Sequence, residues 1–373
     1  MKLESVRDGT VYGTEYRSVV VESGESTFET LGQLPVPADG LDGLRYRLKT
    51  GRWLKGLAER YVGQFPSVNV WPVTATDVVA SADRWLFVSH DGGHTWRPVL
   101  ELPPSSGPMG VLPTGFCHRD GEWYVGEYPL ATDATPRLRR STDCGETWST
   151  LLSLPEVRHV HAVQADPYSG DLWITTGDEG EGCLVGRVRD GRLDVLGRGA
   201  QRWRAVELAF TPSAVLWGMD SVYEPAKPIV CVDRAEVGRP DPTVRTVHEV
   251  SSSVYYSATL TVDGEQWVAF STAKEPGTDS TAPPRRQVSH SESASVVAAS
   301  SASGFTEWHE LAAYGKRSVP ADGVRFDGVA PPANAYVFLA ADPDRGLFVN
   351  PYNTATDGGS VRVFPPSYFA SLG

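Results

Sequence analysis

Short apolar runs separated by polar, glycine-rich turns recur along the whole chain. Residues 123–126 (Trp-Tyr-Val-Gly) and 172–175 (Leu-Trp-Ile-Thr) are typical runs, each lying between turn residues. Runs of this length and residue type predict short β-strands. Stretches with a helical period are nearly absent, and we expect one short helix, over residues 52–61. The pattern therefore predicts an all-β protein.

Two turns share the eight-residue pattern S-x-D-x-G-x-T-W, at residues 89–96 and 141–148. In such a turn the Ser and Asp side chains bond to neighbouring backbone amides, the Gly adopts a left-handed conformation and the Trp packs between sheets. The pattern resembles the Asp-box, or BNR, repeat of β-propellers, in which this turn lies on the blade periphery, away from the ligand face. The resemblance implies structural roles for Ser89, Asp91, Gly93, Trp96, Ser141, Asp143, Gly145 and Trp148.

Weaker copies of the pattern extend its period. They occupy residues 21–28, 188–195 and 301–308, and their spacing leaves room for one unmarked module near residues 233–249. A final module covers residues 336–364. Seven modules of about 53 residues, with four short strands each, account for the chain length. We therefore predict a β-propeller of seven blades, with six blades as the alternative.

The size of the chain suits a single propeller. At 40.4 kDa it can bury an ample core, and a propeller protects its sheet edges by radial repetition. We expect the two chain ends to pair in one shared blade and hence one domain over residues 1–373. Residues 273–295 are rich in Ser, Thr and Pro and are expected to form a mobile surface loop.

The charge balance is strongly acidic. The chain has 46 Asp and Glu residues and a net charge of −12, and of its 34 basic residues only 6 are Lys. An acidic, Lys-poor surface is typical of halophilic proteins, but an Arg-rich, high-GC genome explains the bias equally well. Because no basic cluster exceeds 137–140, we expect no nucleic-acid partner. The composition does not predict the oligomeric state.

The first residues contain two acids and no apolar run, so we expect neither a signal peptide nor a membrane span. The cytoplasm is then the expected location, with a surface- or particle-associated role as the alternative. The cysteines show no C-x-x-C spacing, which favours reduced side chains over zinc ligands or a disulfide framework. The four positions are Cys117, Cys144, Cys183 and Cys231.

Polar residues in the middle third of the chain occur at similar positions in four successive modules. Equal positions in successive blades place side chains around one rim, where a single pocket could collect them. The same stretch resembles uncharacterised single-domain BNR propellers labelled sialidase-like or glycosyl hydrolase, which implies a carbohydrate partner. The candidate catalytic residues are Glu127, Tyr128, His159, His161, Asp178 and Asp220, and the candidate substrate-binding residues are Arg158, Gln201, Arg204 and Trp217.

His159 and His161 share one face of a predicted strand, because side chains alternate with a period of two. No third ligand is spaced to complete a metal site. We therefore expect acid–base chemistry or hydrogen bonds to sugar hydroxyls, with a structural role as the alternative. Asp178 lies beside Glu179 and Glu181 in an acidic loop that offers a general acid or a cation site, or is simply solvated. We expect no metal and no cofactor.

Arg202 and Arg204 flank Trp203 and point away from it if the segment is extended. A guanidinium at this position suits the carboxylate or sulfate of an acidic sugar through a bidentate pair, and Arg158 could do the same. The alternative is a salt bridge within this acidic protein.

A glycoside hydrolase needs two carboxylates across the scissile bond, and Glu127, Asp178 and Asp220 are the candidates. A strict sialidase is disfavoured, because the R-I-P string that normally introduces the first arginine of that family is absent.

A uronate lyase needs an acid–base pair and a positive clamp for the sugar carboxylate. His159, His161, Tyr128 and Arg204 resemble the groups that propeller lyases use. A third class, the non-catalytic glycan-binding, adhesion or assembly propeller, suits the 11 Trp residues, which can stack on sugars. We predict action on, or recognition of, an acidic or surface glycan, and leave hydrolysis, elimination and binding open.

Overall fold

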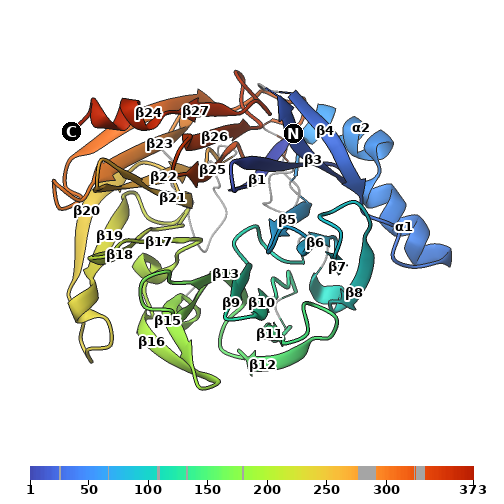
Figure 1. Cartoon of the computed structure of the whole chain (residues 1–373), viewed down its shortest axis with the longest axis horizontal. Coiled ribbons are helices and arrows are strands. Elements are labelled where there is room, and N and C mark those ends of the chain that lie inside the picture. Colours follow the sequence, from blue (N-terminus) through green and yellow to red (C-terminus); the bar gives the residue numbers. More distant parts are fainter. Residues whose placement is uncertain are drawn as a thin grey trace. The chain divides into compact units, whose positions relative to one another are not determined.

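Seven antiparallel sheets form the blades of a β-propeller (Figure 1). The computed structural model describes residues 1–24, 27–65, 67–106, 110–131, 133–178, 180–275, 291–322, 324 and 332–373. Within these residues six sheets have four strands and the last has three. The predictions of an all-β fold and of seven blades are confirmed.

Internal contacts divide the chain into two compact units, which are described separately. The first comprises Met1–Lys55 and Pro66–Arg204, and the second Gly56–Phe65 and Ala205–Gly373. That one domain spans residues 1–373 stays a prediction.

The first unit contains four sheets. They consist of β1 (Lys2–Arg7), β2 (Thr10–Glu15), β3 (Ser18–Gly24) and β4 (Thr27–Gln33); β5 (Val68–Pro72), β6 (Val78–Ala82), β7 (Trp85–Ser89) and β8 (Arg97–Glu101); β9 (Phe116–Arg119), β10 (Glu122–Gly126), β11 (Arg137–Ser141) and β12 (Ser149–Ser153); and β13 (His159–Ala165), β14 (Leu172–Gly177), β15 (Leu184–Arg189) and β16 (Arg192–Arg198). Its short 3-10 helices are η1 (Pro104–Ser106), η2 (Gly180–Gly182) and η3 (Gln201–Trp203).

The second unit contains three sheets. They consist of β17 (Leu208–Phe210), β18 (Ala214–Gly218), β19 (Lys227–Asp233) and β20 (Val244–Val250); β21 (Val254–Val262), β22 (Glu265–Thr272), β23 (Ser293–Ser300) and β24 (Trp308–Gly315); and β25 (Tyr336–Asp342), β26 (Gly346–Tyr352) and β27 (Arg362–Phe364). The 3-10 helix η4 (Arg234–Glu236) and the helix α3 (Pro366–Ala370) complete it.

The chain ends do not share a sheet, so this expectation is wrong. Strand β1 belongs to the sheet β1–β4, and the last strand, β27, pairs with β26. After β27 the chain turns into α3, where Phe369 is fully buried with its ring 5.3 Å from that of Trp267. Packing of this helix takes the place of a closing strand.

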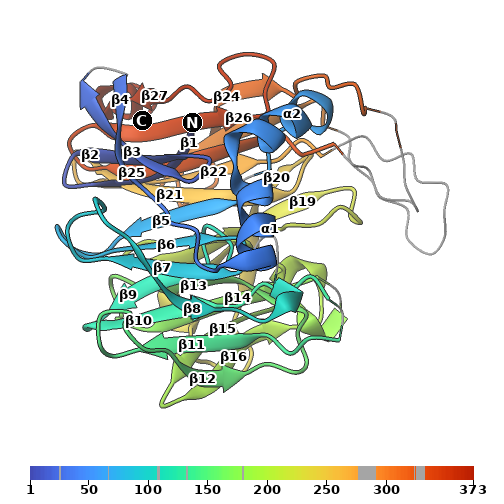
Figure 2. The same ribbon diagram turned by 90° about the vertical axis from the view of Figure 1, so that its right-hand side faces the viewer.

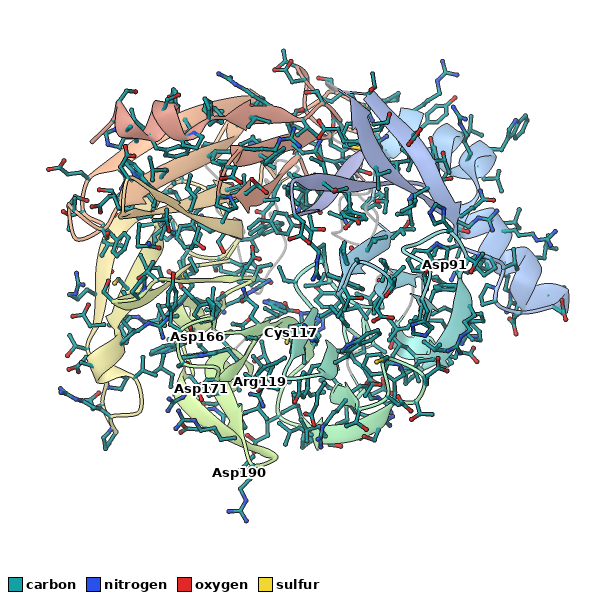
Figure 3. All side chains as sticks on the ribbon, viewed as in Figure 1. Asp91, Cys117, Arg119, Asp166, Asp171 and Asp190 are labelled. Atoms are coloured by element: carbon teal, nitrogen blue, oxygen red, sulfur yellow. The ribbon has the colours of Figure 1, made fainter. Side chains whose placement is uncertain are left out.

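The repeated motif joins the third and fourth strands of a sheet. Residues 89–96 connect β7 with β8, and residues 141–148 connect β11 with β12. The weaker copies at 188–195 and 301–308 lie at the same step, between β15 and β16 and between β23 and β24. Asp91 and Asp190 mark two of these turns in Figure 3. The period of the motif in the sequence thus corresponds to the connection between the third and fourth strands of successive sheets.

Both full copies of the motif have the expected internal bonds. The amides of Gly93 and Thr95 donate to Ser89 Oγ at 2.8 Å and to Asp91 Oδ1 at 2.9 Å. Trp96 Nε1 donates to the carbonyl of Gly93 at 2.7 Å. The second copy repeats these bonds at 2.9, 2.9 and 3.0 Å. Gly93 has φ +101°, which glycine tolerates and other residues rarely adopt.

Two helices follow the first sheet, α1 (Gly40–Thr50) and α2 (Arg52–Val62). The helix predicted over residues 52–61 is confirmed. The sequence prediction missed α1, whose two glycines lower its helix propensity. Tyr46 of α1 is buried among Val70, Val78 and Phe87 of the sheet β5–β8, and Figure 2 shows α1 running across these strands. None of the described helices is long and apolar enough to cross a membrane.

The loop expected over residues 273–295 falls largely outside the described residues, which end at 275 and resume at 291. At its borders, Lys274 forms a β-bridge with Ala335, and residues 293–295 begin β23.

All four cysteines lie in the described part of the chain, and none of them forms a disulfide there. Cys144 is exposed, whereas burial raises the pKa of Cys117 to about 12 and that of Cys231 to about 11.

Neighbouring sheets of the first unit meet through their first strands, and this contact positions the candidate site. Strand β13 contacts β9 and β10, and the amide of Val160 donates to the carbonyl of Glu127 at 3.1 Å. Val160, Val163 and Ile174 pack in the core beneath it. The start of β13 is therefore held beside the chain that leaves β10.

Candidate functional site

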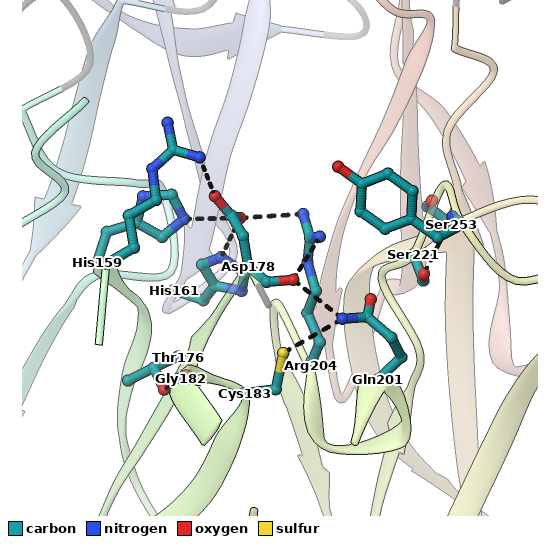
Figure 4. Close-up of polar contacts among 12 residues, drawn as sticks. His159, His161, Thr176, Asp178, Gly182, Cys183, Gln201, Arg204, Ser221 and Ser253 are labelled. Atoms are coloured by element: carbon teal, nitrogen blue, oxygen red, sulfur yellow. Dashed lines mark hydrogen bonds and ion pairs between the residues drawn. The ribbon is translucent and has the colours of Figure 1, made fainter. Parts of the chain in front are cut away.

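The carboxylate of Asp178 is the centre of a polar cluster in the first unit (Figure 4). Its Oδ2 accepts a bond from Arg158 Nη1 at 2.5 Å, and its Oδ1 lies 3.0 Å from His159 Nε2 and 3.2 Å from Arg204 Nη2. The side chain of Asp178 is 15% exposed and that of Arg204 13%, while Arg158 is 42% exposed. One carboxylate thus joins three side chains from two segments.

Strand pairing explains why these residues meet. His159, the first residue of β13, pairs with Gly177, the last residue of β14, so the next residue, Asp178, lies at the same edge of the sheet. Arg158 precedes β13 directly. Antiparallel pairing therefore brings together residues that are about twenty positions apart.

The segment 201–203 is not extended, so the condition under which Arg202 and Arg204 would point away from Trp203 is not met. Gln201–Trp203 form the 3-10 helix η3, and Arg204 follows it. This turn directs Gln201 Nε2 and Arg204 Nη1 toward the backbone carbonyl of Asp178, at 3.0 and 3.1 Å. Gln201 and Arg204 therefore fix the loop that carries the carboxylate.

The two imidazoles lie side by side, as the shared strand face predicts. The ring centroids of His159 and His161 are 5.0 Å apart, and both residues are 2% exposed. Tyr128, from the chain after β10, stacks on His159 with centroids 3.9 Å apart and an interplanar angle of 17°. Its ring centroid is 6.1 Å from that of His161. The sequence candidates Tyr128, His159, His161, Asp178 and Arg204 thus form one group.

The environment keeps Asp178 ionised. Burial acts to raise its pKa, but the hydrogen bond with His159 and the electrostatic interactions with His159, Arg204 and His161 outweigh burial and hold the pKa well below its usual range. A carboxyl with such a low pKa does not carry a proton at neutral pH. Asp178 can therefore orient or polarise an imidazole, but it cannot serve as a general acid.

A third metal-type ligand is present, which corrects our expectation that none is spaced to match. The ligand atoms of His159, His161 and Asp178 all lie within 4.8 Å of one another. Sequence reasoning missed the group because strand pairing, not spacing, supplies the carboxylate. However, Arg158 and Arg204 already contact that carboxylate, and two guanidinium groups oppose the binding of a cation beside them. The charges favour an anion.

Glu127 does not join the cluster through its side chain, which corrects its assignment as a catalytic carboxylate. The residue is 2% exposed, and Arg139 Nε donates to its Oε1 at 2.7 Å. This pair links the residue that follows β10 to strand β11 and leaves the carboxylate occupied within the protein.

Two candidates lie in the second unit. Trp217, expected to bind substrate, is fully buried in β18, so it cannot stack on a sugar. Asp220 follows the same strand and is 5% exposed. Its negative charge, together with burial and Glu275, raises the pKa of Tyr336.

Sequence reasoning missed two positioning residues. A Cβ on Gly177 would lie 2.5 Å from His161 Cε1 and 2.9 Å from Nε2, so only glycine allows the imidazole to approach this closely. Thr114 Oγ1 donates to the carbonyl of His161 at 2.6 Å. Neither Gly177 nor Thr114 belongs to a recognisable motif. The position of Gly177 directly before Asp178 was the one sequence feature that could have drawn attention to it.

Comparisons with known proteins support the fold alone. No protein-family model matches the chain, and no curated protein matches its sequence. Among solved structures, an oligogalacturonate lyase in complex with manganese is 11% identical, with a TM-score of 0.51 over 99% of this chain and 89% of that one. A chain of the mitotic checkpoint complex is equally similar, at 11% identity and a TM-score of 0.51 over 98% and 86%.

An ancestral GH74 enzyme is 11% identical, with a TM-score of 0.47 over 96% of this chain. Our chain spans 54% of the length of that enzyme's chain. At these sequence identities the resemblance is one of fold.

Proposed function

We propose that this protein acts on an acidic glycan by β-elimination, at the cluster around Asp178. One observation carries the proposal: two imidazoles, a tyrosine and two arginines gather around one ionised carboxylate. An acid–base pair beside a guanidinium clamp is what elimination from a uronate requires. The fold is compatible with this chemistry, because an oligogalacturonate lyase shares it.

The same geometry disfavours hydrolysis. A glycosidase needs one protonated and one ionised carboxyl group across the bond. Asp178 is held ionised, and Glu127 is buried in its pair with Arg139. Within the first unit the carboxyl candidates therefore do not supply the protonated member.

The proposed roles follow from the contacts. Arg158 and Arg204 hold the uronate carboxylate. His161, whose Nε2 is 4.0 Å from Asp178 Oδ1, accepts the proton from the carbon next to that carboxylate. The electron pair left on this carbon forms a double bond to the neighbouring carbon, whose bond to the glycosidic oxygen breaks. Tyr128 gives its phenolic proton to the departing oxygen.

His159 is a positioning residue in this scheme. Its ring bridges the Asp178 carboxylate and the face of Tyr128, and so sets the place of the phenol. Asp178 in turn orients His159.

The test is an assay on a panel of uronate-rich and surface polysaccharides, following unsaturated-uronate absorbance and new reducing ends. We expect both signals from the wild type and a fall of at least about a hundredfold in the double variant His161→Ala with Arg204→Ala. Tyr128→Phe, which keeps the aromatic stack, lowers the rate similarly. His94→Gln, at an exposed histidine of the turn 89–96, leaves it unchanged. Because arginine rather than a metal is proposed to hold the substrate carboxylate, we expect a chelator to leave the reaction rate unchanged.

Reducing ends without absorbance would mean hydrolysis and would overturn the proposal. The 2% exposure of both imidazoles favours a second candidate, glycan binding without chemistry, in which the exposed Arg158 makes the main contact. That alternative would be established if no polysaccharide gave a product while the protein still bound a glycan, and if Arg158→Ala abolished this binding.

A further inference from the structure

The helices α1 and α2 expose an unusual concentration of large apolar side chains. Of the exposed large apolar residues in the described part of the chain, eight fall within residues 41–65. Folded proteins rarely leave large apolar helix faces uncovered unless these faces bind something. The eight residues are Leu41, Leu44, Leu48, Trp53, Leu54, Leu57, Tyr61 and Phe65.

Helix α1 carries two opposite faces. Its buried residues, Gly43, Tyr46 and Thr50, face the protein core. Leu41, Leu44 and Leu48 are 75%, 52% and 46% exposed. At about 100° of turn per residue, these leucines form one stripe on the side of the helix opposite the buried face. The stripe therefore points away from the protein.

The leucine stripe of α1 has basic neighbours. Arg45 and Arg47 are exposed and lie on either side of it at helical spacing. Lys49 is exposed as well, although its Nζ lies 3.1 Å from Asp83 Oδ1. Arg45 lies 3.6 Å from Asp42 in an exposed pair, which contributes little.

Helix α2 has no buried residue, but it carries an apolar stripe of its own. Trp53, Leu54, Leu57 and Tyr61 are 88%, 43%, 49% and 56% exposed, and their spacing keeps them within about 100° of arc. On another side, the backbone of the helix contacts the protein, because Arg317 Nη2 donates to the carbonyl of Glu59 at 3.1 Å. The apolar stripe of α2 is thus turned to solvent.

The charge of this segment is opposite to that of the chain. Residues 40–62 contain six basic and two acidic side chains, a net charge of +4, within a protein of net charge −12. A basic amphipathic helix with Trp and Leu on its apolar face is the type that lies in the interface of an anionic bilayer. Two copies meeting through this segment would place like charges together, which disfavours self-association.

We propose that α1 and α2 dock on an anionic phospholipid surface, each inserting its own apolar stripe between the headgroups while its arginines contact lipid phosphates. The proposal does not depend on the glycan chemistry proposed above. It adds a membrane-surface partner to a chain whose described helices cannot span a bilayer.

The test is flotation of the full chain with vesicles of phosphatidylcholine alone or mixed equally with phosphatidylglycerol. We expect at least tenfold stronger binding to the mixed vesicles at low salt, and loss of this preference at high salt. Leu44→Ser with Trp53→Ser lowers the binding at least tenfold. Arg47→Gln with Arg52→Gln lowers it about fivefold per charge.

Matched controls are Val195→Ser and Arg192→Gln in β16, at exposed positions of another sheet. Both should bind the vesicles as the wild type does. Unchanged thermal unfolding verifies that every variant is folded, because the altered side chains face solvent.

Absence of binding to the mixed vesicles, or equal binding to both kinds, overturns the proposal. So does a wild-type dimer that the Leu44→Ser, Trp53→Ser variant dissociates, because the face would then be an interface between copies.

Discussion

The turn at residues 89–96 and the cluster around Asp178 stabilise an ionised carboxylate in opposite ways. The bond from Thr95 Oγ1, the Thr95 amide and Ser89 Oγ hold the pKa of the exposed Asp91 well below its usual range. Asp178 reaches a similar state although burial opposes it, through His159 and Arg204. The Asp91 donors lie within four residues along the chain, whereas the Asp178 partners come from separate segments.

The comparison of Asp91 with Asp178 shows which ionised carboxylates can be predicted from the sequence. A site made by neighbours in sequence leaves a motif, and a site made by strand pairing leaves only scattered residue types. Variants that remove either the sequence-local partners of Asp91 or the distant partners of Asp178 should have different effects on stability and activity.

The largest effect is expected for Asp178→Asn. The substitution leaves Arg204 and His159 beside a neutral amide, and the loss of a buried charge partner lowers the free energy of unfolding by about 4 kcal/mol. Any activity of the cluster should fall with it. Urea unfolding at neutral pH measures the change. A loss no greater than that of Asp91→Asn would contradict a special role for the separate segments.

Glu207, a carboxyl of intermediate exposure, shows a pKa shift of the opposite sign. Glu207, just before β17, accepts a hydrogen bond from the amide of Ser257 at 2.5 Å, and burial raises its pKa to about 8. Because this folded-state pKa is above the unfolded value, the protonated form is favoured in the folded state. The associated stability is complete below about pH 4.5 and is lost as pH rises toward about 8.

We expect this loss to reach about 4 kcal/mol over that interval, and Glu207→Gln to remove most of the pH dependence. Asp178 has the opposite sign: its lowered pKa contributes stability above about pH 4 that is lost as pH falls below this value. Unfolding curves across this pH range test both. A wild-type profile that is flat between pH 4.5 and 8 would show that folding does not raise the pKa of Glu207.

Gly177→Ala tests the packing of the cluster without changing a charge. The added methyl group would displace His161, at a cost of about 2 kcal/mol, and would lower activity more than stability. Gly315→Ala is the matched control, because a Cβ there meets nothing within 4 Å. Equal effects of the two substitutions would contradict the close approach at Gly177.

The smallest effect is expected for Asp91→Ala and Asp143→Ala. Each removes bonds to a single exposed turn, so the unfolding free energy should fall several-fold less than in Asp178→Asn, with activity unchanged. Thermal unfolding and the polysaccharide assay, run together, detect any departure. Lost activity with intact stability would mean that these turns reach the ligand.

The sequence predicted the architecture well for the same reason that it predicted Asp91. Each sheet is built from strands adjacent in sequence, so its turns repeat at a readable period. It predicted α2 but not α1, because Gly40 and Gly43 obscure a helix that is stabilised by the packing of Tyr46.

The candidate site was predicted only as a set of residue types. Tyr128, His159, His161 and Arg204 were expected around one rim and lie close together, but their partner Asp178 was expected to be an acid or a solvated loop residue. Glu127 and Trp217 have the same composition signals and are buried elsewhere. No spacing rule separates these cases, because burial and charge pairing arise only when distant segments meet.

The meander also determines the order in which the protein can assemble during synthesis. Because every strand pairs with its neighbour along the chain, each described sheet needs no segment made later to complete its hydrogen bonds. Sheet β1–β4 is complete once residue 33 has emerged, and β5–β8 once residue 101 has emerged. Short-range contacts form fastest, so a ribosome-bound chain can shield one sheet while the next is still being translated.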